Sequence, residues 1–175
     1  DPALSIDPGT GAVTLSTDPH HEAQDAFSFT VVATDAAGNA SEQAVTMGVN
    51  DLDEVTPSIT SGATATAIDE NSGAAQVIYT ATADDSADVS GGVTFSLAED
   101  SDAALSIDAD TGVVTLTTDP DHETQESYSF TVVATDAAGN ASEQAVTLGI
   151  DDLDDTAPVI TSGDTAPAID ESSGA

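Results

Sequence analysis

The stretch SFTVVATDAAGNASEQAVT occupies residues 28–46 and returns unchanged at residues 129–147. Apolar and polar residues alternate on both sides of its Ala-Ala-Gly-Asn segment, which is typical of two strands joined by a turn. Shorter segments recur at the same offset of 101 residues, with residues 4–7 returning at 105–108 and residues 67–70 at 168–171. A period near 100 residues is the size of one small domain, so we expect a tandem array of such domains.

The natural boundary between copies is an acidic segment that precedes a proline. It reads DLDEVTP at residues 51–57 and DLDDTAP at residues 152–158. This spacing predicts one complete repeat over residues 57–155. Residues 1–54 are then the C-terminal part of a preceding repeat, and residues 158–175 are the N-terminal part of a following one.

The complete repeat shows the two-residue period of β-strands throughout and no helical period. Turn residues, such as Asp110-Thr111-Gly112 and Ala138-Gly139-Asn140, separate the short apolar runs. This pattern predicts an all-β fold, a seven-stranded antiparallel Greek-key β-sandwich of the cadherin or Ig-like type. The side chains expected on the inward phase are Val77, Tyr79, Ala81, Val93, Phe95, Leu97, Val114, Leu116, Tyr128, Phe130, Val132, Ala134, Val146, Leu148 and Ile150.

The charge of the chain is entirely one-sided, with 33 Asp and Glu residues and no Lys or Arg. This balance argues against nucleic acid and anionic membrane surfaces as partners. No apolar run approaches the roughly 18 residues that a membrane span needs. The absence of cysteine excludes disulfides, thiolate zinc sites and thiol nucleophiles. Where the acids cluster, the balancing charge must come from solution, most naturally from a hard divalent cation.

Many of the acids fall in small groups near predicted strand ends or in the segments between repeats. Calcium takes six to eight oxygen ligands from carboxylates and carbonyls, which suits such groups on loops. Magnesium retains water and needs fewer protein oxygens. The alternative interpretation, a solvated acidic surface that binds no ion, remains open at this point. The groups in the complete repeat are Asp69-Glu70, Asp84-Asp85, Asp121 with Glu123, Asp151-Asp152 and Asp154-Asp155.

These groups, in this order, resemble the motifs of the cadherin repeat in the form found in large RTX-type bacterial surface adhesins. The segment 152–158 is similar to the linker DxNDNxP of that family, and Asp121-His122-Glu123 is similar to its DRE motif with His in place of Arg. Residues 107–112 resemble its IDxxTG hairpin, and Asp136 matches the acid after the penultimate strand. Glu70 corresponds to the lone N-terminal acid. The resemblance covers residues 57–158.

The resemblance implies calcium sites at two junctions between successive repeats. In the preceding copy His20 stands where the DRE-like motif has its Asp. Either member of the pair Asp84-Asp85 corresponds to the DxD loop of the family. The ligands implied at the first junction are Glu22, Asp51, Asp53, Glu54, Asp84, Asp85 and Asp136. Those implied at the second junction are Glu70, Asp121, Glu123, Asp152, Asp154 and Asp155.

Other candidate residues favour simpler interpretations. Asp108 and Asp110 lie in a turn between two short strands, where Asp usually caps its own loop. The histidines, His20, His21 and His122, suggest zinc or general-base chemistry, but a surface role is expected for His122. No nucleophile elbow or oxyanion loop is present, so we expect no enzyme activity.

The function implied by the resemblance is that of a calcium-rigidified extender, or spacer, in a repetitive adhesin used for cell adhesion. It would lie outside the cell, at the cell surface, with neighbouring repeats of the same parent chain as its partners and Ca²⁺ as its ion. Two alternatives remain: a module that binds polysaccharide or its own kind, and a metal-independent Ig-like stalk. The inward phase of the aromatic residues leaves no stacking platform for a glycan.

Overall fold

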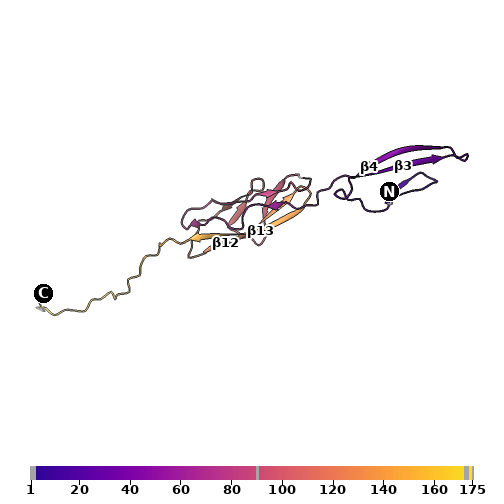
Figure 1. The fold of residues 1–175 in the computed structure, drawn as a ribbon. Helices are drawn as coiled ribbons and strands as arrows, with labels where there is room; N and C mark the ends of the chain where they lie inside the picture. The colour runs from indigo at the N-terminus through magenta and orange to yellow at the C-terminus, as the bar shows by residue number, and fades with distance from the viewer. Residues whose placement is uncertain (1–2, 90, 172–173, 175) are drawn as a thin grey trace.

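The computed structural model describes residues 3–89, 91–171 and 174, and these residues form strands and turns without a helix (Figure 1). The strands are β1 (Leu4–Ile6), β2 (Val13–Leu15), β3 (Ala26–Thr34), β4 (Ala40–Gly48), β5 (Ser58–Ile59), β6 (Ile68–Asp69), β7 (Gln76–Thr80), β8 (Ala83–Asp84), β9 (Val93–Leu97), β10 (Leu105–Ile107), β11 (Val113–Leu116), β12 (Ser127–Asp136) and β13 (Ala141–Asp151). Residues 1–2, 172–173 and 175 of the two expected end pieces lie outside this description.

The expected β-sandwich is confirmed. One sheet has the order β6-β13-β12-β9 and the other has the order β10-β11-β7, while β5 pairs with β8. Neighbours such as β6 with β13 and β7 with β11 are far apart in sequence, as in a Greek-key arrangement. The named strands pair antiparallel except β6 with β13, which are parallel, and the isolated bridge between Thr64 and Thr147 is parallel too.

The expected count of seven strands is not confirmed. Over the described part of residues 57–155 there are nine strand segments, three of which, β5, β6 and β8, have two residues each. The chain changes partners between β5 and β6, because β5 pairs with β8 whereas β6 pairs with β13. The first expected strand therefore appears as two short segments, because its beginning pairs with β8 and its end pairs with β13.

The core lies between the two sheets and consists of the inward side chains of the longer strands. Val114, Leu116, Val132 and Leu148 have no exposed surface. Tyr79 and Phe130 meet edge to face, with ring centroids 5.7 Å apart. The inward phase predicted for β11, β12 and β13 is therefore correct.

The inward phase predicted for Val77 is wrong. Val77 is 63% exposed, whereas its neighbour Ile78 is buried. The reason is a register shift between β7 and β11, where Tyr79 pairs with Val114 and Val77 with Thr115. One extra residue of β7 is accommodated at this bulge, which reverses the faces of the residues before it.

The N-terminal part of the chain repeats the local pairing of the sandwich with less burial, although Phe27 is buried. Phe27 pairs with Met47 in the β3–β4 hairpin, as Tyr128 pairs with Leu148 in β12–β13. Met47 is 38% exposed, whereas Leu148 is fully buried. Of the opposite sheet, β10 and β11 have counterparts in β1 and β2, but β7 has none in residues 3–49, and neither has β9. The register of the hairpin is therefore formed locally, whereas most of its burial is not.

The described chain is elongated, with the N-terminal hairpins toward one end and the C-terminal segment at the other (Figure 1). The N-terminal hairpins, the sandwich and the C-terminal segment follow one another along its length. Residues 152–171 contain no strand, and Val159, Ile160 and Ile169 are largely exposed there. Among the described residues no helix has the length and apolar character to cross a membrane.

Asp108 forms the turn expected of it. Its Oδ1 accepts hydrogen bonds from the backbone N–H of Thr111 at 2.9 Å and from the Thr111 hydroxyl at 2.8 Å. These bonds, the hydroxyl first, lower the pKa of the Asp108 carboxyl. Asp7 makes the equivalent turn and accepts the backbone N–H groups of Gly9 and Thr10.

The first prediction uses the internal repeat as its control. Leu148→Ala should destabilise the sandwich by about 2–5 kcal/mol, because it leaves a cavity in a closed core. Met47→Ala, at the equivalent position 101 residues earlier, should change the free energy of unfolding far less. Urea unfolding followed by circular dichroism measures both. Equal effects of the two substitutions would contradict the assignment of the core.

The second prediction concerns pH. The lowered pKa of Asp108 stabilises the fold above the unfolded value of about 3.9, and this contribution is lost as the pH falls through the lower folded value. Thr111→Val should raise the Asp108 pKa toward its ordinary value because the hydroxyl donor is removed. NMR titration of the carboxyl carbon tests this. Thr10→Val serves as a control that should leave Asp108 unchanged.

Candidate metal centres

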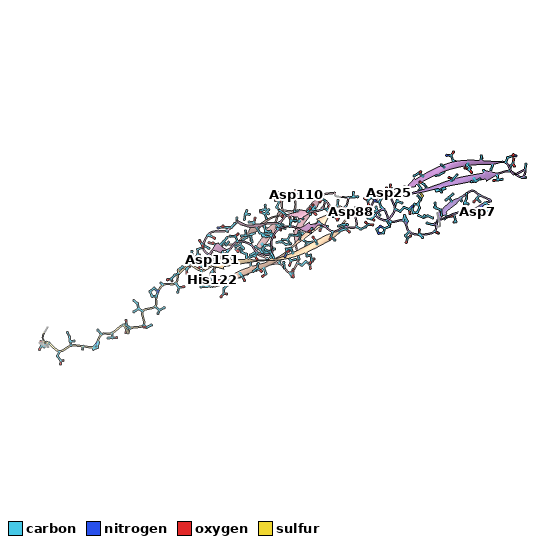
Figure 2. The ribbon with its side chains drawn as sticks, viewed as in Figure 1. Asp7, Asp25, Asp88, Asp110, His122 and Asp151 are labelled. Atoms are coloured by element: carbon cyan, nitrogen blue, oxygen red, sulfur yellow. The ribbon has the colours of Figure 1, made fainter. Side chains whose placement is uncertain are left out.

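Acidic side chains gather at both ends of the sandwich, where the chain enters it at residues 51–57 and leaves it at residues 152–158. Figure 2 labels Asp88 at the N-terminal end of the sandwich and His122 and Asp151 at its C-terminal end. We call these two regions the N-terminal joint and the C-terminal joint.

At the N-terminal joint, Asp53, Asp85 and Asp136 each place a carboxylate oxygen within 4.8 Å of the other two. Asp53 comes from the linker, Asp85 directly follows β8, and Asp136 ends β12. Asn140 ties two of these segments together, since its Nδ2 donates to the backbone carbonyl of Asp53 and to Oδ2 of Asp136, both at 2.9 Å. The turn between β12 and β13 therefore holds the linker beside the cluster.

The electrostatics of this cluster differ from one carboxyl to the next. Burial and the charge of Asp136 raise the pKa of Asp53, with a further contribution from Asp85. Burial also raises the pKa of Asp136, but hydrogen bonds from Asn140 and Gly139 outweigh it, and the net pKa is lowered. Asp136 is thus held ionised by its turn, and Asp53 carries the cost of the shared negative charge.

A second group at the same joint contains histidine. Nδ1 of His21 lies 3.2 Å from Oδ1 of Asp51 and 3.9 Å from Oε1 of Glu22, while Nδ1 of His20 lies 2.5 Å from Oε2 of Glu22. Glu54 joins His20 and Glu22 in a further group. Oδ1 of Asp51 is buried and has no hydrogen bond of good geometry, in spite of its short distance from the imidazole.

The carboxyls of Asp51 and Glu22 are linked. Burial and the neighbouring Glu22 raise the pKa of Asp51, although His21 opposes this. The pKa of Glu22 is lowered by a hydrogen bond from its own backbone N–H and by its contacts with Asp51 and His20. The two pKa shifts have opposite signs, so the cost of the shared negative charge falls on Asp51.

The structure separates the two members of the Asp84-Asp85 pair. Asp85 faces the cluster, whereas Oδ1 of Asp84 accepts the backbone N–H of Ser86 at 3.0 Å. The hydroxyl and the backbone N–H of Ser86 lower the pKa of Asp84. Asp84 does not belong to any group of converging ligand atoms among the described residues.

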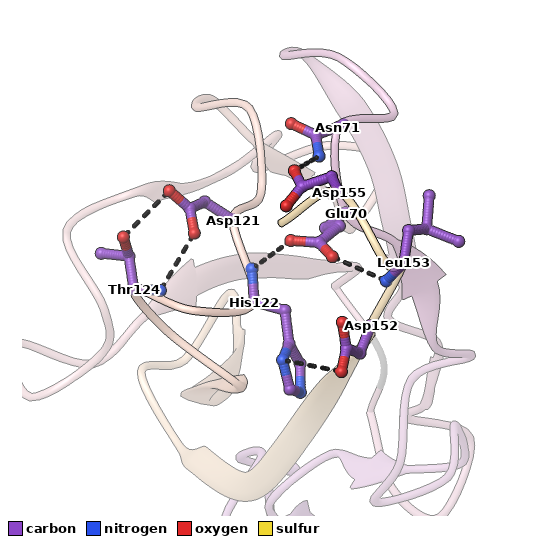
Figure 3. A network of polar contacts seen from close by, with 8 residues as sticks. All are labelled: Glu70, Asn71, Asp121, His122, Thr124, Asp152, Leu153 and Asp155. Carbon is purple, nitrogen blue, oxygen red and sulfur yellow. Dashed lines mark hydrogen bonds and ion pairs between the residues drawn. The ribbon is translucent and has the colours of Figure 1, made fainter. Parts of the chain in front are cut away.

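At the C-terminal joint, Glu70, Asp121 and Glu123 converge within 4.8 Å. Figure 3 shows Glu70 between the backbone nitrogens of His122 and Leu153. Glu70 is only 2% exposed. Its Oε2 accepts the backbone N–H of His122 at 2.8 Å, and its Oε1 accepts that of Leu153 at 2.6 Å. The bond from Leu153, followed by that from His122, lowers the pKa of Glu70.

The remaining acids of this joint have distinct positions. Asp121 accepts the backbone N–H and the hydroxyl of Thr124, and Asp155 accepts Nδ2 of Asn71 at 2.9 Å. Oδ2 of Asp152 lies 3.9 Å from Nδ1 of His122. Asp154 is exposed and joins none of the converging groups in the described part of the chain.

Glu123 carries the unfavourable charge at this joint. A hydrogen bond from its own backbone N–H lowers the pKa of Glu123, but burial and the charges of Glu70 and Asp155 raise it by more. Its position therefore resembles that of Asp53 at the other joint.

Several participants were missed from the sequence. Asn140 was read only as a turn residue, and Asp88 was not grouped with the joint, although its Oδ2 lies 3.4 Å from the backbone nitrogen of Glu54. His122 was expected to be a surface residue, and His21 was given no site role. The adjacency of His21 to Glu22, repeated as His122 to Glu123, is the signal that could have drawn attention to them.

The donors at Asp53, Asp85 and Asp136 fit a hard divalent cation. All three are carboxylates from separate segments, and the chain has no Lys or Arg to balance them. Calcium accepts such oxygen ligands in flexible geometry and tolerates additional water and carbonyl ligands.

Comparison with known proteins connects this arrangement to a family. The cadherin domain family matches residues 52–151, which is more than half of the chain, and a bacterial Ig-like domain family matches residues 2–49. Human Protocadherin Fat 1 is 30% identical over 174 residues, covering 96% of this chain. The Drosophila melanogaster protocadherin-like wing polarity protein stan is 28% identical over 170 residues, covering 91%. The chain spans only 4% and 5% of the lengths of these two relatives.

Solved structures agree on the fold. Domains EC22-24 of mouse cadherin-23 align with a TM-score of 0.62 and 23% identity, over 87% of this chain and 51% of theirs. The extracellular cadherin domains 3-6 of Protocadherin Gamma B2 align with a TM-score of 0.59 and 19% identity, over 89% of this chain and 40% of theirs. Cadherin domains are adhesion modules. The chain belongs to the cadherin family.

Proposed function

We propose that this chain is a spacer segment of a repetitive cell-surface adhesin in which calcium stiffens the joints between successive repeats. The observation that carries the proposal is the convergence of Asp53, Asp85 and Asp136 from three separate segments. With no Lys or Arg in the chain, a cation from solution is the natural source of the balancing charge. Once bound, calcium would supply that charge and join the linker to the sandwich.

The residues of the chain prepare the joint for this role. Asn140 holds the linker carbonyl of Asp53, and the turn amides hold Asp136 in its ionised form. Without a cation, repulsion between Asp53 and Asp136 opposes the closed arrangement. The expected consequence is a joint that flexes when the ion is removed and becomes rigid when it is restored.

The adhesin context is supported by two observations. The bacterial Ig-like family matches residues 2–49, and the two copies are nearly identical, which suits a strut that is repeated for length. The partners we propose are the neighbouring repeats of the same parent chain, and the location is the cell surface. The repeat boundaries of this proposal are residues 1–54, 57–155 and 158–175.

Other roles have less support. Tyr128 and Phe130 are buried, and Tyr79 and Phe95 pack against the core, so no observation favours a polysaccharide-stacking surface. A metal-independent stalk remains the direct competitor. It differs from the proposal in a single measurable way, because it predicts no response to calcium or to chelators.

The third prediction tests the calcium response of the whole chain. Calcium should raise the melting temperature of the sandwich and narrow the distribution of shapes in small-angle X-ray scattering, and EDTA should reverse both changes. At a calcium concentration about 100 times the Kd, the added stability is about 2.7 kcal/mol. Asp53→Asn should weaken the response by removing one carboxylate of the converging three.

Its matched control is Asp110→Asn, which makes the same charge change in an exposed turn and belongs to none of the converging carboxylate groups among the described residues. This control should respond to calcium like the original chain. Scattering curves and melting temperatures that are identical with calcium and with EDTA would exclude the calcium role and favour the metal-independent stalk.

Glu70 has a second task that does not require an ion. It accepts one backbone N–H from the 120–123 loop and one from the segment after β13, and it thereby joins two chain segments at the C-terminal joint. Both donors need an acceptor at this buried position, and a carboxylate satisfies both at once.

The fourth prediction follows from this geometry. In EDTA, Glu70→Gln should lower the melting temperature by several degrees, because the amide group turns one N–H₂ toward a backbone donor. Glu171→Gln makes the same substitution at the equivalent exposed position 101 residues later and should have no measurable effect. Differential scanning calorimetry compares the two variants, and equal melting temperatures would contradict the anchoring role.

A further inference from the structure

The group formed by His21, Glu22 and Asp51 differs chemically from the all-carboxylate cluster beside it. Its three ligand atoms are an imidazole nitrogen and two carboxylate oxygens, all within 4.8 Å of one another. His21 and Asp51 are each about one-third exposed or less, with 34% and 29% of their side chains accessible. The group is thus partly shielded and open on one side.

The ligand types select the ion. Calcium and magnesium take oxygen ligands, whereas imidazole nitrogen is a preferred ligand of zinc and of the neighbouring transition metals. Zinc bonds of about 2.0–2.2 Å in tetrahedral geometry place ligand atoms about 3.3 Å apart. The separation of 3.2 Å between Nδ1 of His21 and Oδ1 of Asp51 matches that edge.

Asp51 supplies an independent observation. Its Oδ1 is buried and has no hydrogen bond of good geometry, although it lies next to the imidazole nitrogen. A buried carboxylate oxygen that lacks a hydrogen-bond donor requires an explanation. An ion held between this oxygen and Nδ1 of His21 would satisfy both atoms.

We propose that His21, Glu22 and Asp51 form a binding site for a divalent transition metal of the zinc class. The inference rests on the proposed function and deepens it, because it places a second kind of ion at the N-terminal joint. Calcium would bind at Asp53, Asp85 and Asp136. The two ions would compete only for Glu22 and Asp51, which the family resemblance also implies as calcium ligands. The joint then responds to two ions through two sets of ligands.

His20 has a positioning role in this site. Its Nδ1 contacts Oε2 of Glu22, the oxygen that is not directed to His21. Oε2 of Glu22 therefore faces His20 and Oε1 faces His21, so Oε1 is the oxygen placed to meet the ion. A surface hollow reaches Glu22 but neither His21 nor Asp51, and it is lined by His20, Glu22, Glu54, Val55, Ala87 and Asp88.

The second copy provides an internal comparison. His122, Glu123 and Asp152 form the equivalent group, but the separation between His122 and Asp152 is 3.9 Å. Asp121 stands where the first copy has His20, and Glu123 also joins the Glu70 cluster. The second site should therefore bind the same metals more weakly than the first.

The experiment uses Co²⁺ as a spectroscopic probe and Zn²⁺ in calorimetry, on the full chain in calcium-free buffer. The chain should bind one Co²⁺ tightly, with visible d–d absorption, and Zn²⁺ should displace it. His21→Ala should weaken binding at least tenfold, because it removes the nitrogen ligand. His122→Ala, the matched control, should change the affinity of the tight site less than twofold.

His20→Gln gives a further readout that separates positioning from ligation. It should weaken binding but keep the absorption band of the nitrogen-ligated ion. The inference is overturned if no d–d band appears, or if His21→Ala and His122→Ala bind Co²⁺ equally. Either result would leave the histidines as simple ion-pair partners of the carboxylates. Circular dichroism of each variant verifies that it is folded.

The two proposals can fail separately. Asp53→Asn should reduce the calcium response and leave Co²⁺ binding intact, while His21→Ala should do the reverse. If the unsubstituted chain binds Co²⁺ tightly but does not respond to calcium, the calcium role is overturned and the transition-metal site is kept.

Discussion

Repulsion between carboxylates is the constraint on which this structure depends. With 33 acids and no basic side chain other than three histidines, the chain must find other partners for its negative charge. Backbone N–H groups are the partners it uses most. Asp7, Asp108, Asp136 and Glu70 each accept two or more such donors, and each has a lowered pKa. In this protein the backbone N–H groups of tight turns stabilise the ionised carboxylates, a role that Lys and Arg side chains have in other proteins.

The same constraint locates the joints. In the described part of the chain three carboxyls have a raised pKa, namely Asp51, Asp53 and Glu123, and all three lie at the two joints. In each case burial and nearby acids outweigh the available donors. A stiff turn can supply amides to its own aspartate, but a linker between two domains has few to offer. The balancing charge is therefore missing at the joints, and an ion from solution would bring the two repeats together there.

The sequence predicted the sandwich and its main strands because long strands with one buried face leave a clear two-residue period. It predicted Val77 incorrectly because a bulge between β7 and β11 arises from the pairing of distant strands, which no local pattern records. The same limit applies to the joint. The acids near position 85 were visible, but the choice of Asp85 over Asp84 depends on the direction of a two-residue strand. The bridge from Asn140 to the linker spans 87 residues and could not be read from spacing.

The repeated stretch at residues 28–46 and 129–147 shows which structural properties depend on the local sequence and which depend on the surrounding strands. Its two copies have the same register, although Val31 is half-buried where Val132 is fully buried. Hairpin geometry is thus a property of the segment, and burial is a property of its neighbours. The N-terminal joint takes Glu22 and Asp51 from the less buried copy and Asp85 and Asp136 from the closed sandwich. An ion that bridges the two sets would join a well-buried half to a less buried one, and any ordering of the less buried half would reduce the affinity of the ion. Stiffness at such a joint is consequently set by the packing of each repeat as much as by its ligands.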